Sequence, residues 1–101
     1  MIKLEDYYKV FVGQLANKNQ FVVWFKNDAN NQCVAFQSYQ TLIAILDGHT
    51  LYINWQKWDY SKTTLKHLKM FVNEYTPYTY ETKYQFLCEI RSNQNIIPFE
   101  E

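Results

Sequence analysis

The sequence predicts an α+β domain, in which an antiparallel sheet of four to five strands, built from hairpins, carries one or two helices on one face. The length of 101 residues is the usual size of one domain. Three Trp, nine Tyr and seven Phe supply a hydrophobic core and exclude a disordered chain. Short β-rich runs between turn residues precede one clear helical pattern. We expect the domain to span residues 1–91 and residues 92–101 to form a C-terminal tail.

The N-terminal segment, residues 4–15, has a helical spacing. Its apolar residues recur every three or four positions, as along one face of a helix: Leu4, Tyr7, Tyr8, Phe11 and Leu15. We therefore expect a helix here. Val10, Val12 and Gly13 are poor helix formers, and a strand is the alternative.

Two hairpins follow. In the first, β-branched and aromatic strands at 21–25 and 33–36 flank a turn rich in Asn and Asp. In the second, strands at 41–46 and 49–55 flank an Asp-Gly pair, which is typical of a type I′ turn. Because both alternating sets of residues in 41–46 are apolar, this strand should be central and covered on both faces. A helix over 39–46 is the competing interpretation.

A helix begins after Ser61, which has the side chain of an N-cap. Tyr60 and Leu65 stand where a hydrophobic staple would place them. Leu65, Leu68, Phe71, Val72 and Tyr75 form its apolar face, and Pro77 ends it.

Residues 78–91 alternate between apolar and polar positions. This period of two predicts a strand with one covered face, and a helix over 81–91 is the alternative. The expected order of elements is therefore α-β-β-β-β-α-β.

A cluster of lysines marks the start of the helix that follows Ser61. Lys62, Lys66 and Lys69 project within about 60° of one another on a helix, and Lys57 lies just upstream. Together with Thr63, Thr64 and the free backbone N–H groups of the first turn, they form a candidate anion site. Its ligand would be the phosphate of a nucleic acid or the acidic side chains of a partner. The alternative is an ordinary solvated helix face.

Aromatic residues form a second candidate site, for a partner protein. If Phe21, Val23 and Phe25 face the core, Trp24 faces the other way. By the same argument Leu51, Ile53 and Trp55 face the core, and Tyr52 faces the other way. Tyr39 and Trp58 lie in connections. We expect Trp24 and Tyr52 to share the sheet face that the helices leave uncovered. Such a patch suits a protein interface or base stacking. The alternative is that the tail or the second copy in a homodimer covers it.

The chain offers little for catalysis. Asp59, Ser61 and His67 can be written as a triad, but a capped helix contains such residues by chance. The two glycines stand far apart, so there is no glycine-rich phosphate loop. Two cysteines and two histidines do not make a metal site. We expect no enzymatic activity, no cofactor and no metal.

Charge and hydropathy narrow the class further. Ten basic and ten acidic residues cancel, which argues against both a strongly basic nucleic-acid binder and an acidic DNA mimic. No apolar run is long enough to cross a membrane, and the N-terminus lacks the pattern of a secretory signal. We therefore expect a cytoplasmic protein that does not enter membranes.

Two blocks of sequence resemble a group of small proteins of unknown function from phages and other mobile elements. The first is Ser-Tyr-x-Thr-x-Ile-Ala, at 38–44, and the second is Tyr-Ser-x-Thr-Thr-x-Lys-His, at 60–67. The resemblance implies an accessory gene of a phage or plasmid in a bacterial host. Small proteins of such elements often bind and block a host protein, as anti-CRISPR proteins do. The expected function is thus binding and inhibition of a host protein, such as a CRISPR effector nuclease; the alternative is a nucleic-acid-binding module.

Overall fold

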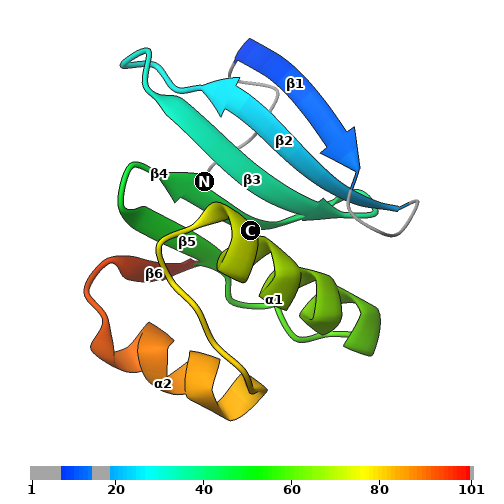
Figure 1. The fold of residues 1–101 in the computed structure, drawn as a ribbon, viewed down its shortest axis with the longest axis vertical. Coiled ribbons are helices and arrows are strands. Elements are labelled where there is room, and N and C mark those ends of the chain that lie inside the picture. Colours follow the sequence, from blue (N-terminus) through cyan, green and yellow to red (C-terminus); the bar gives the residue numbers. More distant parts are fainter. Residues whose placement is uncertain (1–7, 15–18, 101) are drawn as a thin grey trace.

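The structure is a computed structural model and describes residues 8–14 and 19–100. This part of the chain forms one sheet of six strands and two helices (Figure 1). The elements are β1 (Tyr8–Gln14), β2 (Gln20–Lys26), β3 (Gln32–Ser38), β4 (Thr41–Asp47), β5 (Thr50–Asn54), α1 (Lys62–Tyr75), α2 (Lys83–Ser92) and β6 (Ile96–Phe99). The strands lie side by side in chain order. Neighbours pair antiparallel except β5 and β6, which pair in parallel. The α+β class is confirmed, with one strand more than expected.

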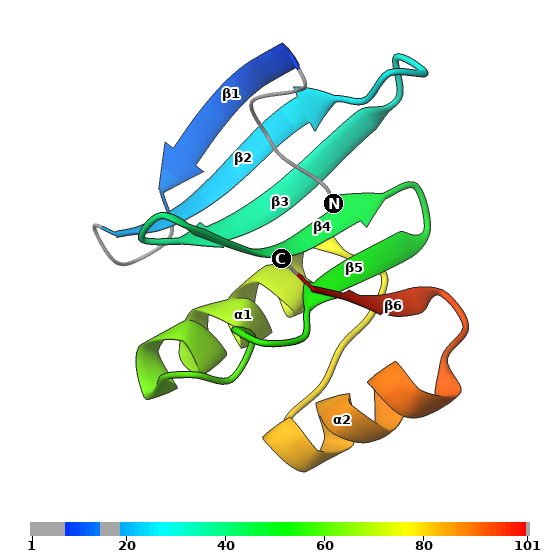
Figure 2. The same cartoon turned by 180° about the vertical axis from the view of Figure 1, so that it is seen from behind.

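Both helices pack on the same face of the sheet. Figure 1 shows them together on its lower side, and Figure 2 shows the same arrangement from behind. The larger core lies between this face and the helices, where Phe36 of β3 stacks on Phe71 of α1 with ring centroids 5.9 Å apart. A second cluster of buried side chains, including Val23, Phe25 and Ile45, lies on the opposite face. The prediction that strand 41–46 is central and buried on both faces is confirmed.

Both predicted hairpins are present, and their turns explain the local sequence. In the β2–β3 turn the Asn27 side chain accepts hydrogen bonds from the N–H groups of Ala29 and Asn31. In the β4–β5 turn the two central residues are Gly48 and His49, because Asp47 already pairs with Thr50. Of these two residues Gly48 alone has a positive φ, of 63°. That pattern belongs to a type II′ turn, so the predicted type I′ turn is wrong.

Two of the predicted elements are wrong in type. Residues 8–14 of the expected N-terminal helix form strand β1, the alternative interpretation, and residues 4–7 and 15 lie outside the described part. Pairing with β2 overrides the helical spacing, in agreement with the β-branched Val10 and Val12. Residues 83–91 of the expected C-terminal strand, together with Ser92 of the expected tail, form α2, so the alternative interpretation of a helix in this segment is confirmed.

The sequence before α2 contains a helix N-cap that the alternating pattern of residues 78–91 led us to overlook. The Thr82 side chain caps α2 by accepting a hydrogen bond from the N–H of Gln85, at 3.1 Å. The Gln85 side chain in turn accepts one from the N–H of Glu81, at 2.7 Å. A Thr followed three residues later by Gln is a capping-box pattern. Phe86 and Ile90, four residues apart, then form the buried face.

The expected C-terminal tail is part of the sheet. Ile96–Phe99 form β6, which extends the sheet beyond β5. The N–H of Leu51 donates to the carbonyl of Asn95, and the N–H of Trp55 donates to that of Phe99. Ile96 is buried in the larger core, which gives the strand its anchor. Residues 96–99 therefore belong to the domain rather than to a tail.

Candidate functional site

A basic pocket lies where the first half of α1 meets the connection to α2 and the start of α2. It is open to solvent, has a volume of about 330 Å³ and has seven lining residues: Lys62, Leu65, Lys66, Lys69, Tyr80, Glu81 and Lys83. Four of the seven are lysines, three from α1 and one from α2. The pocket is therefore a positively charged cavity with an apolar part formed by Leu65 and Tyr80.

The start of α1 sets the positions of the lysines. Ser61 caps the helix as predicted, with its side chain accepting a hydrogen bond from the N–H of Thr64 at 3.1 Å. Since α1 begins at Lys62, residues 62, 66 and 69 follow at helical spacing along one side. The first turn of α1 holds no acidic residue, so no carboxylate within it offsets the positive end of the helix dipole or the charge of Lys62.

Two ion pairs cross the pocket region: one joins α1 to the connection between the helices, and the other joins α2 to the loop before α1. Lys69 pairs with Glu81 at 3.3 Å, and Lys83 pairs with Asp59 at 3.1 Å. Exposed pairs of this kind contribute little to stability, but they occupy two of the pocket's four ammonium groups. Lys62 and Lys66 are exposed and form no ion pair within the described residues. These two lysines are the ones available to an anionic ligand.

The pocket is part of a wider basic surface, which we define by five of the nine lysines of the chain: Lys57, Lys62, Lys66, Lys69 and Lys83. Its acidic residues, Asp59 and Glu81, leave a net charge of +3 in a chain whose total charge is zero. The structure thus brings Lys83, which sequence reasoning missed, into one pocket with three of the four predicted lysines, Lys62, Lys66 and Lys69. It was missed because residues 78–91 were expected to be a strand elsewhere in the sheet.

Three exposed aromatic side chains lie within two or three residues of the surface lysines along the chain. Tyr60 is 49% exposed, and the ammonium of Lys57 lies 5.7 Å from the centre of its ring. Tyr84, next to Lys83, is 76% exposed. Trp55 is partly exposed and stacks on Trp58 with centroids 6.3 Å apart. The expectation that Trp55 faces the core is therefore wrong.

Tyr39 also lies near the start of α1. The hydroxyl of its neighbour Ser38 is within 3.1 Å of the hydroxyl of Thr64, in the first turn of that helix. Tyr39 itself is 50% exposed and has a φ of +55°. Tyr39 is the first of the two turn residues between β3 and β4, where a tight hairpin requires a positive φ. This φ is unfavourable for a bulky residue. Tyr39 remains a candidate for partner binding because its side chain is half exposed.

Trp24 and Tyr52 do not share a face, which corrects the predicted aromatic patch. Trp24 packs on the helix side, with its ring 5.7 Å from that of Tyr75 in α1. Tyr52 packs against the second cluster, on the opposite side. The sheet register explains this, because the residue of β5 in line with Trp24 is Leu51. Tyr52 therefore points the other way.

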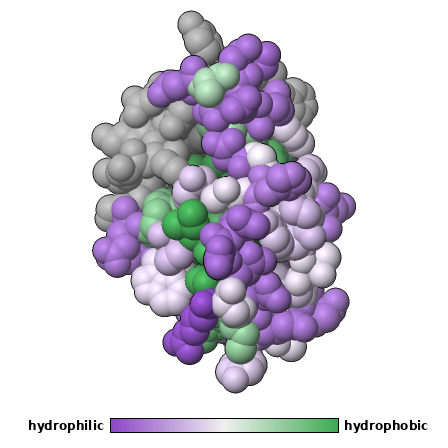
Figure 3. Space-filling view, turned by 90° about the vertical axis from the view of Figure 1, so that its left-hand side faces the viewer, coloured by the Kyte–Doolittle hydropathy of each residue, from purple (hydrophilic) through white to green (hydrophobic). Residues whose placement is uncertain are grey.

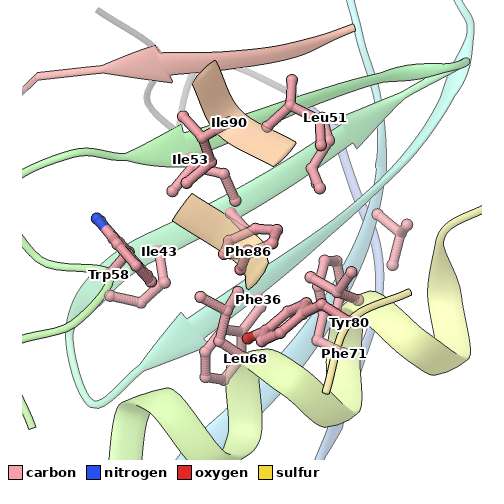
Figure 4. Packing of buried hydrophobic residues seen from close by; sticks show 14 of the residues in the cluster. Phe36, Ile43, Leu51, Ile53, Trp58, Leu68, Phe71, Tyr80, Phe86 and Ile90 are labelled. Atoms are coloured by element: carbon pink, nitrogen blue, oxygen red, sulfur yellow. The ribbon is translucent and has the colours of Figure 1, made fainter. Parts of the chain in front are cut away.

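Trp58 is also not a surface residue. It is 3% exposed and contacts Phe86 of α2 edge-to-face, with ring centroids 5.6 Å apart. Figure 4 shows its side chain among the core residues beside Ile43. The backbone folds back after β5, as the N–H of Trp58 donates to the carbonyl of Asn54, and this turn carries the ring under α2. The predicted role of Trp58 in partner binding is therefore wrong.

The two threonines predicted for the anion site have structural positions. Thr64 is fully buried, and its hydroxyl accepts a hydrogen bond from Ser61 at 3.0 Å besides its contact with Ser38. It cannot reach a ligand. Thr63 is half-buried, and its carbonyl lies 2.8 Å from Nδ1 of His67. The His67 imidazole therefore contacts the Thr63 carbonyl and not the Ser61 hydroxyl. Asp59, Ser61 and His67 do not form a catalytic triad.

Tyr80 is a pocket residue that sequence reasoning placed in a strand. Its backbone is tied to α1 because its N–H donates to the side chain of Asn73, which donates in turn to the Tyr80 carbonyl. Its ring stacks on Phe86, with centroids 4.2 Å apart. Its hydroxyl is buried and has no hydrogen-bond partner within the described residues. Burial raises the pKa of this hydroxyl, which stays protonated.

Figure 3 shows one side of the molecule, which is mostly hydrophilic. Its hydrophobic residues form only a narrow strip. No group of three or more His, Cys, Asp or Glu side chains suited to a metal ion occurs among the residues that the structure describes. The helices α1 and α2, of 14 and 10 residues, lack the length and hydropathy needed to cross a bilayer.

Comparison with known proteins identifies the family. A family model described as a family of unknown function, DUF8033, matches residues 8–87. The chain belongs to the DUF8033 family. The DUF8033 match runs from β1 into α2 and includes the five lysines of the basic surface. No curated protein and no solved structure matches the chain significantly.

Proposed function

We propose that this DUF8033 protein is a non-enzymatic nucleic-acid-binding module that binds single strands through the basic surface. One observation carries the proposal: α1 and α2 bring four lysines to one pocket, and a fifth, Lys57, lies 5.7 Å from the ring of the exposed Tyr60. Lysines bind phosphates without regard to sequence. Exposed rings such as Tyr60 and Tyr84 stack on bases, which duplex DNA keeps stacked internally.

Lys62 and Lys66 are the phosphate ligands in this proposal. They carry the free ammonium groups of the pocket, because Lys69 and Lys83 are each held in an ion pair. The first N–H groups of α1 lie next to Lys62 and add a favourable field for an anion. A strand following this path would run past Tyr60 and over the opening of the pocket.

The test is fluorescence anisotropy with a labelled single-stranded oligonucleotide, over a salt series from about 50 to about 200 mM. Binding should weaken steeply with salt, and the double variant Lys62→Gln/Lys66→Gln should reduce the slope of log K against log salt by about 1.4, or about 0.7 per lost phosphate contact. Lys26→Gln is the matched control, because Lys26 is exposed at the far end of β2. No binding at the lowest salt, or an equal loss with the control, would contradict the proposal.

A second candidate function is binding and inhibition of a host protein by an accessory protein of a phage or plasmid, acting in the bacterial cytoplasm. The observation that favours it is the contact between Ser38 and Thr64, which joins the two sequence blocks that resemble mobile-element proteins. Tyr39 and Tyr60, one from each block, are both about half exposed. They would form the centre of a protein interface, where Tyr is a frequent hot-spot residue.

The two functions differ in their response to salt. A complex with a host protein, for instance a purified CRISPR effector nuclease, should survive size-exclusion chromatography at high salt and be lost in Tyr39→Ala or Tyr60→Ala. A homodimer formed through the same tyrosines would appear as a concentration-dependent shift in the elution of the free protein. A monomer that forms no complex with any tested nuclease would count against the second function.

A further inference from the structure

The basic pocket offers more than the exposed charges that phosphate binding requires, because its lining also includes apolar side chains. Contacts with a phosphate backbone need only exposed cations, yet this pocket has a volume of about 330 Å³, at the lower end of the range for small-molecule pockets. Part of its wall is apolar and consists of Leu65 and the Tyr80 ring. The pocket therefore suits a ligand that has a small apolar or aromatic body as well as an anionic group.

The Tyr80 hydroxyl is an unused polar group at this pocket. Tyr80 lines the cavity and is 4% exposed, and within the described residues its hydroxyl has no hydrogen-bond partner. Figure 4 shows the Tyr80 hydroxyl directed toward α1, near Leu68. The same helix supplies Leu65. Buried hydroxyl groups are nearly always paired in folded proteins, since leaving one unpaired is costly. A polar atom of a ligand would remove that cost.

The charges of the pocket determine where the anionic group of the ligand binds. Lys62 and Lys66 carry the free positive charges, one helical turn apart on α1. Two ammonium groups at this spacing can share one phosphate. Lys69, the next lysine along α1, is neutralised by Glu81. The ligand is therefore asymmetric, with its anionic group toward Lys62 and Lys66 and its neutral body toward Leu65 and Tyr80.

We propose that the pocket holds one nucleotide of the bound strand, with its base against Leu65 and Tyr80 and its phosphate between Lys62 and Lys66. The inference rests on the proposed nucleic-acid binding and adds a subsite to it. A base has a flat apolar face for Leu65 and the Tyr80 ring, and it has polar edge atoms for the Tyr80 hydroxyl. The rest of the strand follows the surface lysines and the exposed rings.

The decisive variant is Tyr80→Phe, which removes the hydroxyl and keeps the ring. Its stability in urea should equal or exceed that of the wild type, because an unpaired buried hydroxyl is lost. Its affinity for a single-stranded oligonucleotide should nevertheless fall by about three- to tenfold, the effect of one hydrogen bond. A tyrosine with a merely structural role would not combine unchanged or higher stability with weaker binding.

A second variant tests the volume of the pocket. Leu65→Phe places a larger side chain in the wall and should weaken binding, whereas Leu65→Met, which conserves volume, should bind as the wild type does. Thymidine 5′-monophosphate should compete with the oligonucleotide, and inorganic phosphate at the same concentration should compete far less.

The outcomes separate the subsite from the proposed function. If Tyr80→Phe and Leu65→Phe bind the oligonucleotide as tightly as the wild type while Lys62→Gln/Lys66→Gln binds weakly, the strand lies on the lysines alone and the subsite is wrong. If the wild type binds no oligonucleotide at the lowest salt, both the function and the subsite are wrong. Weaker binding by both pocket variants, with stability retained in Tyr80→Phe, supports both.

Discussion

The Ser38 hydroxyl lies 3.1 Å from the Thr64 hydroxyl, and both side chains are fully buried. This contact joins the end of β3 to the first turn of α1. Thr64 also accepts a hydrogen bond from Ser61, the residue that caps α1. A short chain of hydroxyl groups thus fixes the start of the lysine-bearing helix against the β3–β4 turn, and with it the relative positions of Tyr39 and Tyr60.

Thr64→Val should destabilise the protein by about 1–3 kcal/mol, since it keeps the shape of the side chain but leaves buried hydroxyl groups without a partner. Urea unfolding measures this. In the double variant Ser38→Ala/Thr64→Val the loss should be smaller than the sum of the two single losses, because the two residues share one interaction. Additive losses would show that the contact between Ser38 and Thr64 contributes nothing.

Tyr39→Asn should stabilise the free protein by about 0.5–1 kcal/mol, because Asn tolerates the positive φ of this position better than Tyr does. The same change should weaken binding to any partner that contacts the exposed ring. Thermal unfolding measures the first effect. Gln40→Asn, at the neighbouring turn residue, is the control. A loss of stability in Tyr39→Asn would mean that the half-buried ring contributes more through packing than the φ angle costs.

Trp58→Ala should cost about 3–5 kcal/mol, the usual range for removing a buried Trp. Trp55→Ala should cost less than about 1 kcal/mol, because Trp55 is 37% exposed and loses mainly its stacking on Trp58. Urea unfolding of both variants forms a matched pair from the same segment. Equal losses would contradict the assignment of Trp58 to the core.

The two free cysteines should differ in reactivity. Cys88 is exposed on α2, whereas Cys33 is buried in the second cluster. Burial, with the neighbouring Asp47 carboxylate, raises the pKa of the Cys33 thiol from 9.0 to about 11. At pH 8 a thiol reagent should therefore modify one cysteine rapidly, and the second only after unfolding. Cys88→Ser should abolish the rapid phase.

The raised pKa of Cys33 also predicts a loss of stability at alkaline pH. In the unfolded chain this thiol ionises near pH 9.0, but in the native state it keeps its proton up to about pH 11. Between these values the native state binds more protons, so the free energy of unfolding falls as the pH rises from 9 to 11. Urea midpoints across this range should fall less steeply in Cys33→Ala. Burial raises the pKa of Tyr80 in the same direction, so part of the slope should remain.

Local signals in the sequence determined much of the fold. The two hairpins and the start of α1 at Ser61 follow from side chains a few residues apart, whose turn and capping hydrogen bonds form within one segment. Where a segment fitted both a helical and a strand pattern, the predicted type of element was wrong. Residues 8–14 have a helical spacing and pair as a strand. Residues 83–91 follow an alternating pattern but belong to a capped helix.

By itself the sequence determined the α+β class and four lysines of the basic surface, because charge at helical spacing and a helix cap are local properties. Only the tertiary structure decided which aromatic residues are exposed. Trp24 and Tyr52 are separated by the strand register, and Trp58 is buried because the chain folds back beneath α2. The pocket itself combines α1 with Tyr80 and Lys83. Its existence depends on long-range packing of α2, which no spacing within one segment reveals.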